Sequence, residues 1–226
     1  MENITYKSKS NEIGKETEIK IESIENIENQ KPIIEYDKTI SLDLVRSVCI
    51  LGEIDSGKTN LAFWYLKNYK GKRKTYLLGY PKEVAGYQRL NAFEDVFKLK
   101  DSIIYIDELQ KFIKVYDRKS NYQLMELISL FAHKNNTLIF TTQATQFVTR
   151  GVEHFIDVWV IKNMDLESLK NGSKAKRVIQ RLSDPRKTEW YLSLEKNEYY
   201  EYSEKNEIGQ NKVKTFPDMG INKDWR

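Results

Sequence analysis

The chain has 226 residues, with a hydrophobic fraction of 40%, a charged fraction of 31% and a formal net charge of +4. This composition is typical of a folded water-soluble protein, and no apolar run is long enough to cross a membrane. The first residues lack the apolar core of a secretion signal, so we expect an intracellular protein. One cysteine, Cys49, and two histidines exclude an intrachain disulfide and a familiar zinc site.

The first 41 residues are predicted to form an acidic, flexible arm. Residues 1–44 contain six lysines and ten acidic residues, which gives them a charge of −4, whereas residues 45–226 carry +8. Isoleucines recur every third residue in this polar stretch, and only residues 33–36 are predicted to pair with the edge of a sheet. The basic charge of the rest of the chain is compatible with nucleic-acid binding.

A phosphate-binding loop is predicted at residues 52–59, whose sequence GEIDSGKT fits the pattern G-x-x-x-x-G-K-[ST]. The loop follows an apolar strand at residues 47–51 and precedes a helix at residues 57–69, as the motif requires. Backbone N–H groups would hold the phosphates, Lys58 would reach the β- and γ-phosphates, and Thr59 would bind Mg²⁺. The alternative is an ordinary glycine-containing turn. The predicted nucleotide-binding residues are Gly52, Glu53, Ile54, Asp55, Ser56, Gly57, Lys58 and Thr59.

Strands and helices then alternate along the chain, which predicts an α/β fold. One helix is marked by apolar residues on a single face, namely Leu124, Leu127, Ile128 and Phe131. Such alternation predicts a parallel sheet covered by helices, with ligands bound at the carboxyl ends of the strands. The remaining strands are expected at residues 75–78, 102–106, 137–142 and 158–161, and the remaining helices at 92–99, 121–133 and 145–155.

Polar residues follow two of these strands and are candidates for chemistry. Asp107 is suited to hold Mg²⁺ opposite Thr59, and Glu108 to orient and deprotonate a water that attacks the γ-phosphate. Acidic residues at strand ends also cap helices, which is the alternative interpretation. Gln143 ends the strand at residues 137–142 and would lie beside the γ-phosphate if that strand lies between the first and the third. Its alternative role is that of a solvated strand end.

The chain beyond Lys162 is predicted to form an appendage to this core. We expect a helix over residues 165–182, a hairpin of residues 188–194 with 199–203, and an extended tail over 205–226. Basic residues gather at 67–74 and 170–187, where they would contact nucleic-acid phosphates or serve only solubility. The predicted domains are the arm (1–41), a P-loop core (42–163), the helix and hairpin appendage (164–204) and the tail (205–226).

Three segments together resemble the FtsK–HerA superfamily of P-loop motor ATPases: the loop at 52–59, IYIDE at 104–108 and HKNNTLIFTTQ at 133–143. The resemblance covers about residues 45–163 and is greatest to viral genome-packaging ATPases and zonula-occludens-toxin-like phage assembly ATPases. It implies a RecA-like fold with its five strands in the order 5-1-4-3-2. It also implies a homo-oligomeric, hexameric ring that binds ATP and Mg²⁺ and moves double-stranded DNA.

The chain departs from this family at Ala132, because its members usually have an arginine there that reaches the γ-phosphate of a neighbouring subunit. We expect Arg150 to replace it, since Arg150 lies just beyond the strand that ends at Gln143. Lys134 and Arg118 are the alternatives. Each of these cations would otherwise be an ordinary surface charge.

The sequence therefore predicts a Mg-dependent ATPase that moves or packages viral or plasmid double-stranded DNA. Its predicted catalytic residues are Lys58, Glu108, Gln143 and Arg150, and its predicted metal ligands are Thr59 and Asp107. One alternative is a nucleotide-switched virion or phage-type assembly factor that contacts a capsid or other structural protein. Another is a small-molecule kinase, which the lack of an arginine-rich lid after Gln143 disfavours. We expect no membrane partner and a cytoplasmic location, which for a viral protein means the host cytoplasm or the virion.

Overall fold

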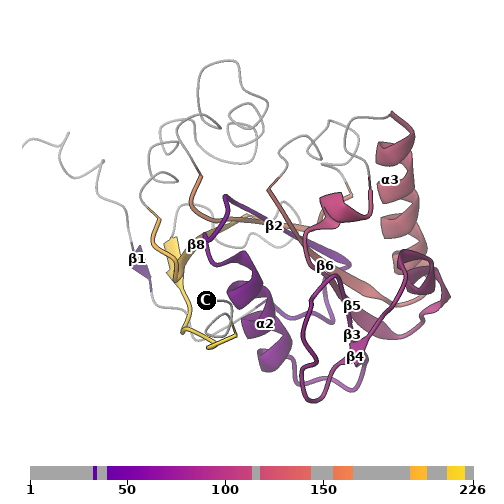
Figure 1. The fold of residues 1–226 in the computed structure, drawn as a ribbon, viewed down its shortest axis with the longest axis horizontal. Helices are drawn as coiled ribbons and strands as arrows, with labels where there is room; N and C mark the ends of the chain where they lie inside the picture. The colour runs from indigo at the N-terminus through magenta and orange to yellow at the C-terminus, as the bar shows by residue number, and fades with distance from the viewer. Residues whose placement is uncertain are drawn as a thin grey trace, which may run out of the picture. The chain divides into compact units, whose positions relative to one another are not determined.

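The computed structural model describes residues 33–34, 40–113, 118–143, 155–164, 194–202 and 213–221. All of them belong to one compact unit that spans Lys31–Arg226 (Figure 1). Within these residues, none of the helices combines the length and the apolar character that crossing a bilayer requires. The predicted arm lies outside them, apart from residues 33–34 and 40–41.

A mixed sheet forms the centre of the fold, and its described strands lie in the order β1-β9-β8-β7-β2-β6-β5-β3-β4. Neighbouring strands are parallel, except that β8 runs antiparallel to β7 and to β9. The bounds are β1 (Ile33–Ile34), β2 (Ser47–Leu51), β3 (Lys74–Leu78), β4 (Gln88–Arg89), β5 (Ser102–Ile106), β6 (Thr137–Thr142), β7 (Val158–Ile161), β8 (Glu198–Tyr202) and β9 (Val213–Thr215). The α/β fold class is confirmed. The five predicted strands are β2, β3, β5, β6 and β7, and they lie in the order β7-β2-β6-β5-β3, which is the order 5-1-4-3-2 that the resemblance implies. Four further strands, which that order does not include, extend the two edges of the sheet: β1, β8 and β9 at one edge and β4 at the other.

The helices connect strands of this sheet. Helix α2 (Lys58–Asn68) follows the loop directly, and α3 (Arg118–His133) begins three residues before its predicted start. The predicted helix at 92–99 is instead the 3₁₀-helix η1 (Phe93–Lys98), and a second 3₁₀-helix, η2 (Leu109–Lys111), was not expected. The helices expected at 145–155 and 165–182 fall almost wholly outside the described residues.

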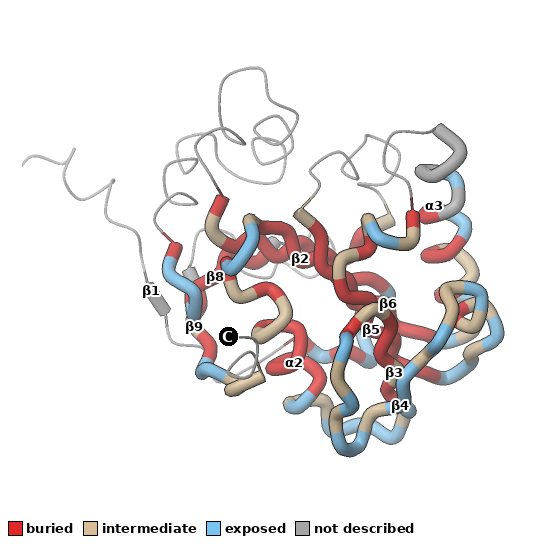
Figure 2. The backbone as a smooth tube through the Cα atoms, viewed as in Figure 1, coloured by how far each residue is buried: buried red, intermediate tan, exposed pale blue. Residues whose placement is uncertain are grey.

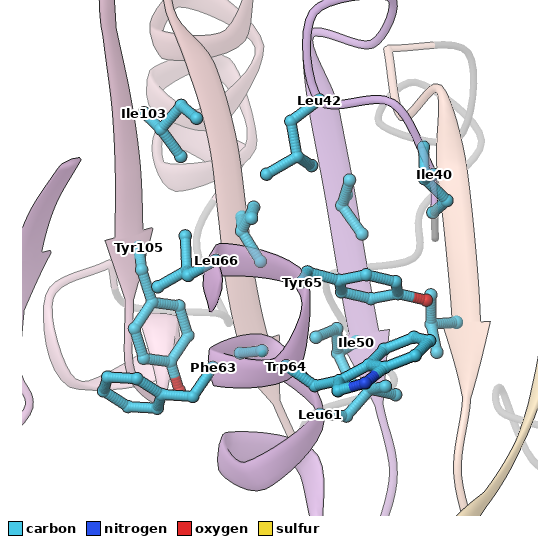
Figure 3. Close-up of a cluster of buried hydrophobic side chains, with 14 of the residues drawn as sticks. Ile40, Leu42, Ile50, Leu61, Phe63, Trp64, Tyr65, Leu66, Ile103 and Tyr105 are labelled. Carbon is cyan, nitrogen blue, oxygen red and sulfur yellow. The ribbon is translucent and has the colours of Figure 1, made fainter. Parts of the chain in front are cut away.

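Two hydrophobic clusters cover the two faces of the central strands, because successive side chains of a strand point to opposite faces. On one face, Ile50 and Tyr105 pack with Phe63 of α2, whose ring lies 5.6 Å from that of Tyr105 (Figure 3). On the other face, Ile104 packs in the same cluster as Leu124 of α3. Buried residues accordingly concentrate in the central strands and α2 (Figure 2). Burial on both faces explains the uninterrupted apolar runs of these strands.

The C-terminal strands correct two predictions. Strand β8 was expected to form a hairpin with residues 188–194, but it pairs with β7 on one side and with β9 on the other. Residues 188–193 lie outside the described residues. The expected tail is wrong for residues 213–215, which form β9, and for Phe216, which is buried. The edge strand predicted at 33–36 is confirmed for residues 33–34, which form β1 and pair with β9, and residues 35–36 lie outside the described residues.

A buried ion pair connects β9 to β8. Lys214 Nζ of β9 lies 2.6 Å from Oε1 of Glu201 on β8, and their side chains are 4% and 1% exposed. The hydroxyl of Tyr65 on α2 donates a hydrogen bond of 3.0 Å to Oε2 of the same glutamate. Because buried charges are stable only when they are paired, Glu201 joins the C-terminal strands to the helix that follows the predicted loop.

Candidate nucleotide-binding site

The predicted phosphate loop connects the end of β2 to the first turn of α2. Gly57 caps α2 with a φ of 89°, and a Cβ there would lie 2.5 Å from the carbonyl oxygen of Lys196. A Cβ at Gly52 would lie 2.6 Å from the Cβ of Lys162 and 2.8 Å from Oγ of Ser56. Neither position has room for a side chain, so both glycines of the motif are required by this packing.

Lys58 begins α2 and folds back over the loop. The residue is buried, with 7% of its surface exposed, and its Nζ donates a hydrogen bond of 2.6 Å to the carbonyl oxygen of Glu53. Burial lowers the pKa of Lys58, and the nearby carboxylates of Glu108 and Glu53 oppose that shift. The charge of Lys58 therefore faces the same space as the acidic residues at the end of β5.

The strand end of β5 brings Asp107 next to the loop. Oγ1 of Thr59 donates a hydrogen bond of 3.1 Å to Oδ1 of Asp107. The same oxygen accepts hydrogen bonds from the hydroxyls of Tyr105, at 2.5 Å, and Thr141, at 3.1 Å. Three hydroxyls from α2, β5 and β6 thus fix the orientation of one carboxylate. The sequence predicts that Thr59 and Asp107 bind the same cation, and in the structure their side chains are in direct contact.

Glu108 adopts a left-handed backbone conformation, with φ 54° and ψ 70°, that few residues other than glycine favour. Its N–H donates to Oγ1 of Thr141 at 2.8 Å, which holds this backbone in place. Oε1 accepts a hydrogen bond of 2.8 Å from Nε2 of Gln143, and Oε2 lies 2.7 Å from Nζ of Lys111. Glu108 and Gln143, predicted from separate strand ends, are therefore in contact. Backbone strain of this kind is common at functional sites.

These residues fit a nucleoside triphosphate with a magnesium ion. Oγ of Ser56 is buried in the loop, with no hydrogen-bond partner among the described residues, and so retains a donor for a bound group. Lys58 and the N-terminus of α2 supply positive charge beside it. Within the described part of the chain no three His, Cys, Asp or Glu side chains are grouped to hold a metal. A cation bound by Thr59 and Asp107 would accordingly need phosphate oxygens or water as its other ligands.

Of the three candidates to replace the arginine finger, only the side chain of Lys134 is among the described residues. Arg150 lies outside the described residues, and only the backbone of Arg118 is described. Lys134 lies just before β6, at the opposite end of that strand from Gln143, and its Nζ donates to the carbonyl oxygen of Phe97. Ala132 is part of α3.

Sequence reasoning missed Lys162, which follows β7 and packs beneath the loop. Its side chain is fully buried, its Nζ donates to the carbonyl oxygens of Lys196, at 2.8 Å, and Glu198, and it lies 4.6 Å from the centre of the Phe216 ring. Burial lowers the pKa of Lys162 to about 7, an effect that Glu198 opposes and Lys58 increases. The sequence does contain a signal for this role, because a lysine that directly follows a buried apolar strand is expected near the site at the carboxyl end of the sheet. Lys111 and Thr141 were also missed, because their roles depend on contacts between strand ends.

A phosphate-type loop after β2, with acidic residues after the parallel strand β5 that β6 separates from β2, defines the P-loop NTPase fold. No protein-family model matches the chain, and no curated protein matches its sequence. Among solved structures, the chain is similar to the genome packaging NTPase B204 from Sulfolobus turreted icosahedral virus 2 in complex with ATP-gammaS. That likeness has a TM-score of 0.55 and 16% identity, over 77% of this chain and 98% of that one.

The chain is likewise similar to B204, the DNA-packaging ATPase from Sulfolobus turreted icosahedral virus, with a TM-score of 0.52 and 19% identity over the same shares. At these identities the likeness establishes a common fold. The fold expected from the FtsK–HerA resemblance is therefore confirmed.

Proposed function

We propose that the chain is a Mg-dependent ATPase that drives the movement of double-stranded DNA during genome packaging. The observation that carries the ATPase proposal is the joining of three sequence-distant parts at one sheet edge. Thr59 of the loop contacts Asp107 after β5, and Glu108 contacts Gln143 after β6. This arrangement matches the parts that a phosphate-loop hydrolase needs: a phosphate cradle, a metal site, a base and a group that orients water.

In this proposal each residue has one role. The loop amides and Lys58 bind the phosphates, and Thr59 with Asp107 holds Mg²⁺, which would neutralise charge on the β- and γ-phosphates. Glu108 accepts a proton from the attacking water while Gln143 orients that water. The Glu108 carboxylate has one present partner on each oxygen, so lone pairs remain on it to accept a hydrogen bond from the water.

The proposal of DNA movement is supported by the net charge of the chain and by its similarity in fold to packaging enzymes. Residues 45–226 carry a net charge of +8, which favours binding to phosphate backbones regardless of sequence. The proteins with the similar fold are named as genome packaging and DNA-packaging enzymes. We propose a homo-oligomeric, hexameric ring in which a basic residue of the neighbouring subunit, Arg150 in our assignment, completes the site.

The test is the ATPase rate with and without duplex DNA, at several salt concentrations. We expect duplex DNA to raise the rate of the wild-type chain, with an effect that falls as salt increases. Glu108→Gln should abolish both the basal and the stimulated rate. A rate that is indifferent to DNA at low salt would contradict DNA movement while leaving the ATPase proposal standing.

A second candidate is a nucleotide-switched assembly factor with slow turnover. The observation in its favour is that both carboxylate oxygens of Glu108 are already engaged, by Gln143 and Lys111. Such a protein would bind ATP tightly, hydrolyse it slowly and bind a structural partner such as a capsid protein only in the ATP state. Comparing partner binding in ATP and ADP separates this candidate from the motor.

A further inference from the structure

The C-terminal segment at residues 216–221 lies beside the first turn of α2, next to the predicted phosphate loop. Oδ1 of Asn60 accepts a hydrogen bond of 2.9 Å from the N–H of Met219, and its Nδ2 donates one of 3.1 Å to Oδ1 of Asp218. Asn60 directly follows Thr59, so these two hydrogen bonds hold the segment one residue beyond the proposed metal ligand. The segment follows β9, which places it beside α2 in Figure 1.

The strands on the two sides of the loop indicate how a bound nucleotide would be oriented. One flank of the loop is the side of β6 and β5, and the other is the side of β7, β8 and β9. Thr59 contacts Asp107 after β5, and Glu108 contacts Gln143 after β6, so the β- and γ-phosphates belong on the β5 and β6 side. Strand β2, which leads into the loop, has β6 on that side and β7, β8 and β9 on the other. The flank toward the C-terminal strands is therefore left for the remainder of the nucleotide. The segment begins on that flank, after β9, is held by Asn60 at the first turn of α2, and ends at Ile221, whose carbonyl oxygen accepts a hydrogen bond of 3.5 Å from the hydroxyl of Tyr80.

The chemistry of the segment suits a nucleoside. Met219 and Ile221 are half-buried against the cluster that contains α2, and they offer apolar surface to a base. Asp218 is exposed and accepts a hydrogen bond of 2.9 Å from the N–H of Gly220, which fixes a tight turn with a φ of 67° at that glycine. A carboxylate has about four lone-pair positions, enough to accept ribose hydroxyls as well. Among the described residues, no heavy atom lies within 4 Å of a Cβ built at Gly220.

From this placement we infer that residues 216–221 form the nucleoside subsite of the nucleotide site. Asp218 accepts hydrogen bonds from the ribose, Met219 packs against the base, and Asn60 is a positioning residue that holds the segment to the loop. This inference rests on the proposed function and adds to it the part of the ligand that the phosphate loop does not contact.

The test compares ATP with inorganic tripolyphosphate, which shares its phosphates but has no nucleoside. Binding of both is measured by calorimetry, with Mg²⁺, on the wild-type chain, Asp218→Ala, Met219→Ala and the control Asp95→Ala, which removes an exposed aspartate of η1. We expect Asp218→Ala and Met219→Ala each to weaken ATP binding about three- to tenfold while tripolyphosphate changes less than about twofold. The wild-type chain should also prefer ATP to 2′,3′-dideoxy-ATP, and Asp218→Ala should lose that preference.

Two results would overturn the inference. Unchanged ATP affinity in both variants would show that the segment does not contact the nucleoside. Equal weakening of ATP and tripolyphosphate would show that it only supports the loop. A wild-type chain that binds neither ligand would instead contradict the proposed function, so the two failures are distinguishable.

Discussion

Gln143 Nε2 donates a hydrogen bond of 2.8 Å to Oε1 of Glu108, and this contact joins the ends of the neighbouring strands β5 and β6. Thr141 strengthens the connection, because its Oγ1 accepts the Glu108 N–H and donates to Asp107. The orientation of the proposed base is therefore set from the adjacent strand. A group that attracts the Gln143 amide, such as a γ-phosphate, would also alter the position of Glu108.

Gln143→Ala should lower kcat by about ten- to a hundredfold with little change in nucleotide affinity, because it removes the group that orients the base and the water. The measurement is steady-state ATPase kinetics together with equilibrium binding of ATP. Gln88→Ala, on the exposed edge strand β4, is the matched control and should be neutral. Loss of ATP affinity in proportion to kcat would assign Gln143 to binding instead.

Lys111→Ala should raise the basal ATPase rate severalfold. Its ammonium lies 2.7 Å from Oε2 of Glu108 and competes with the attacking water for that carboxylate. Lys98→Ala is a close control, because Lys98 and Asp95 form an exposed pair at 2.8 Å with the same i,i+3 spacing in η1. A rate that falls in Lys111→Ala alone would indicate that Lys111 assists the reaction directly.

Thr59→Ala should raise the Mg²⁺ concentration needed for half-maximal ATPase activity by about tenfold, because a metal ligand is lost. Thr59→Ser keeps the hydroxyl beside Asp107 and should retain most of the wild-type dependence. A Mg²⁺ titration of the three proteins at fixed ATP measures this effect. If Thr59→Ala and Thr59→Ser shift the titration equally, the hydroxyl is not a ligand.

Lys162 should make the free energy of unfolding depend on pH. Its pKa is about 7 in the folded chain and 10.5 when exposed, so the unfolded chain binds more protons between these values and stability rises with pH there. Relative to Lys162→Met, the wild-type chain should gain roughly 2 kcal/mol between pH 7 and pH 9. Urea unfolding of both proteins at the two pH values measures this difference. A wild-type stability that falls relative to the variant would mean that Lys162 is stabilised in its charged form.

The central strands and the loop were predictable because their signals are local. Strands at 102–106, 137–142 and 158–161 have the predicted bounds, since buried parallel strands appear as uninterrupted apolar runs. The neighbouring positions of Thr59 and Asp107 followed from the rule that strand ends meet at one edge.

The C-terminal part was not predictable by the same reasoning. Strand β8 was assigned to a nearby hairpin, but it pairs with β7, where Tyr202 lies opposite Trp159. Strand β9 resembles a polar tail in sequence because Lys214 is charged, and the buried partner of that lysine, Glu201, lies on a different strand. The support of the loop by Lys162 and Lys196 likewise depends on contacts between distant segments.

The most direct test of the central claim is phosphate release from ATP by the wild-type chain and by Glu108→Gln, with ATP affinity measured on the same preparations. We predict steady turnover by the wild-type chain in the presence of Mg²⁺ and duplex DNA. Glu108→Gln should bind ATP with similar affinity and release phosphate at least about a hundredfold more slowly, because it keeps the shape of the side chain and loses the base. Equal rates for the two proteins, or no turnover by the wild-type chain under these conditions, would contradict the claim that this site hydrolyses ATP through Glu108.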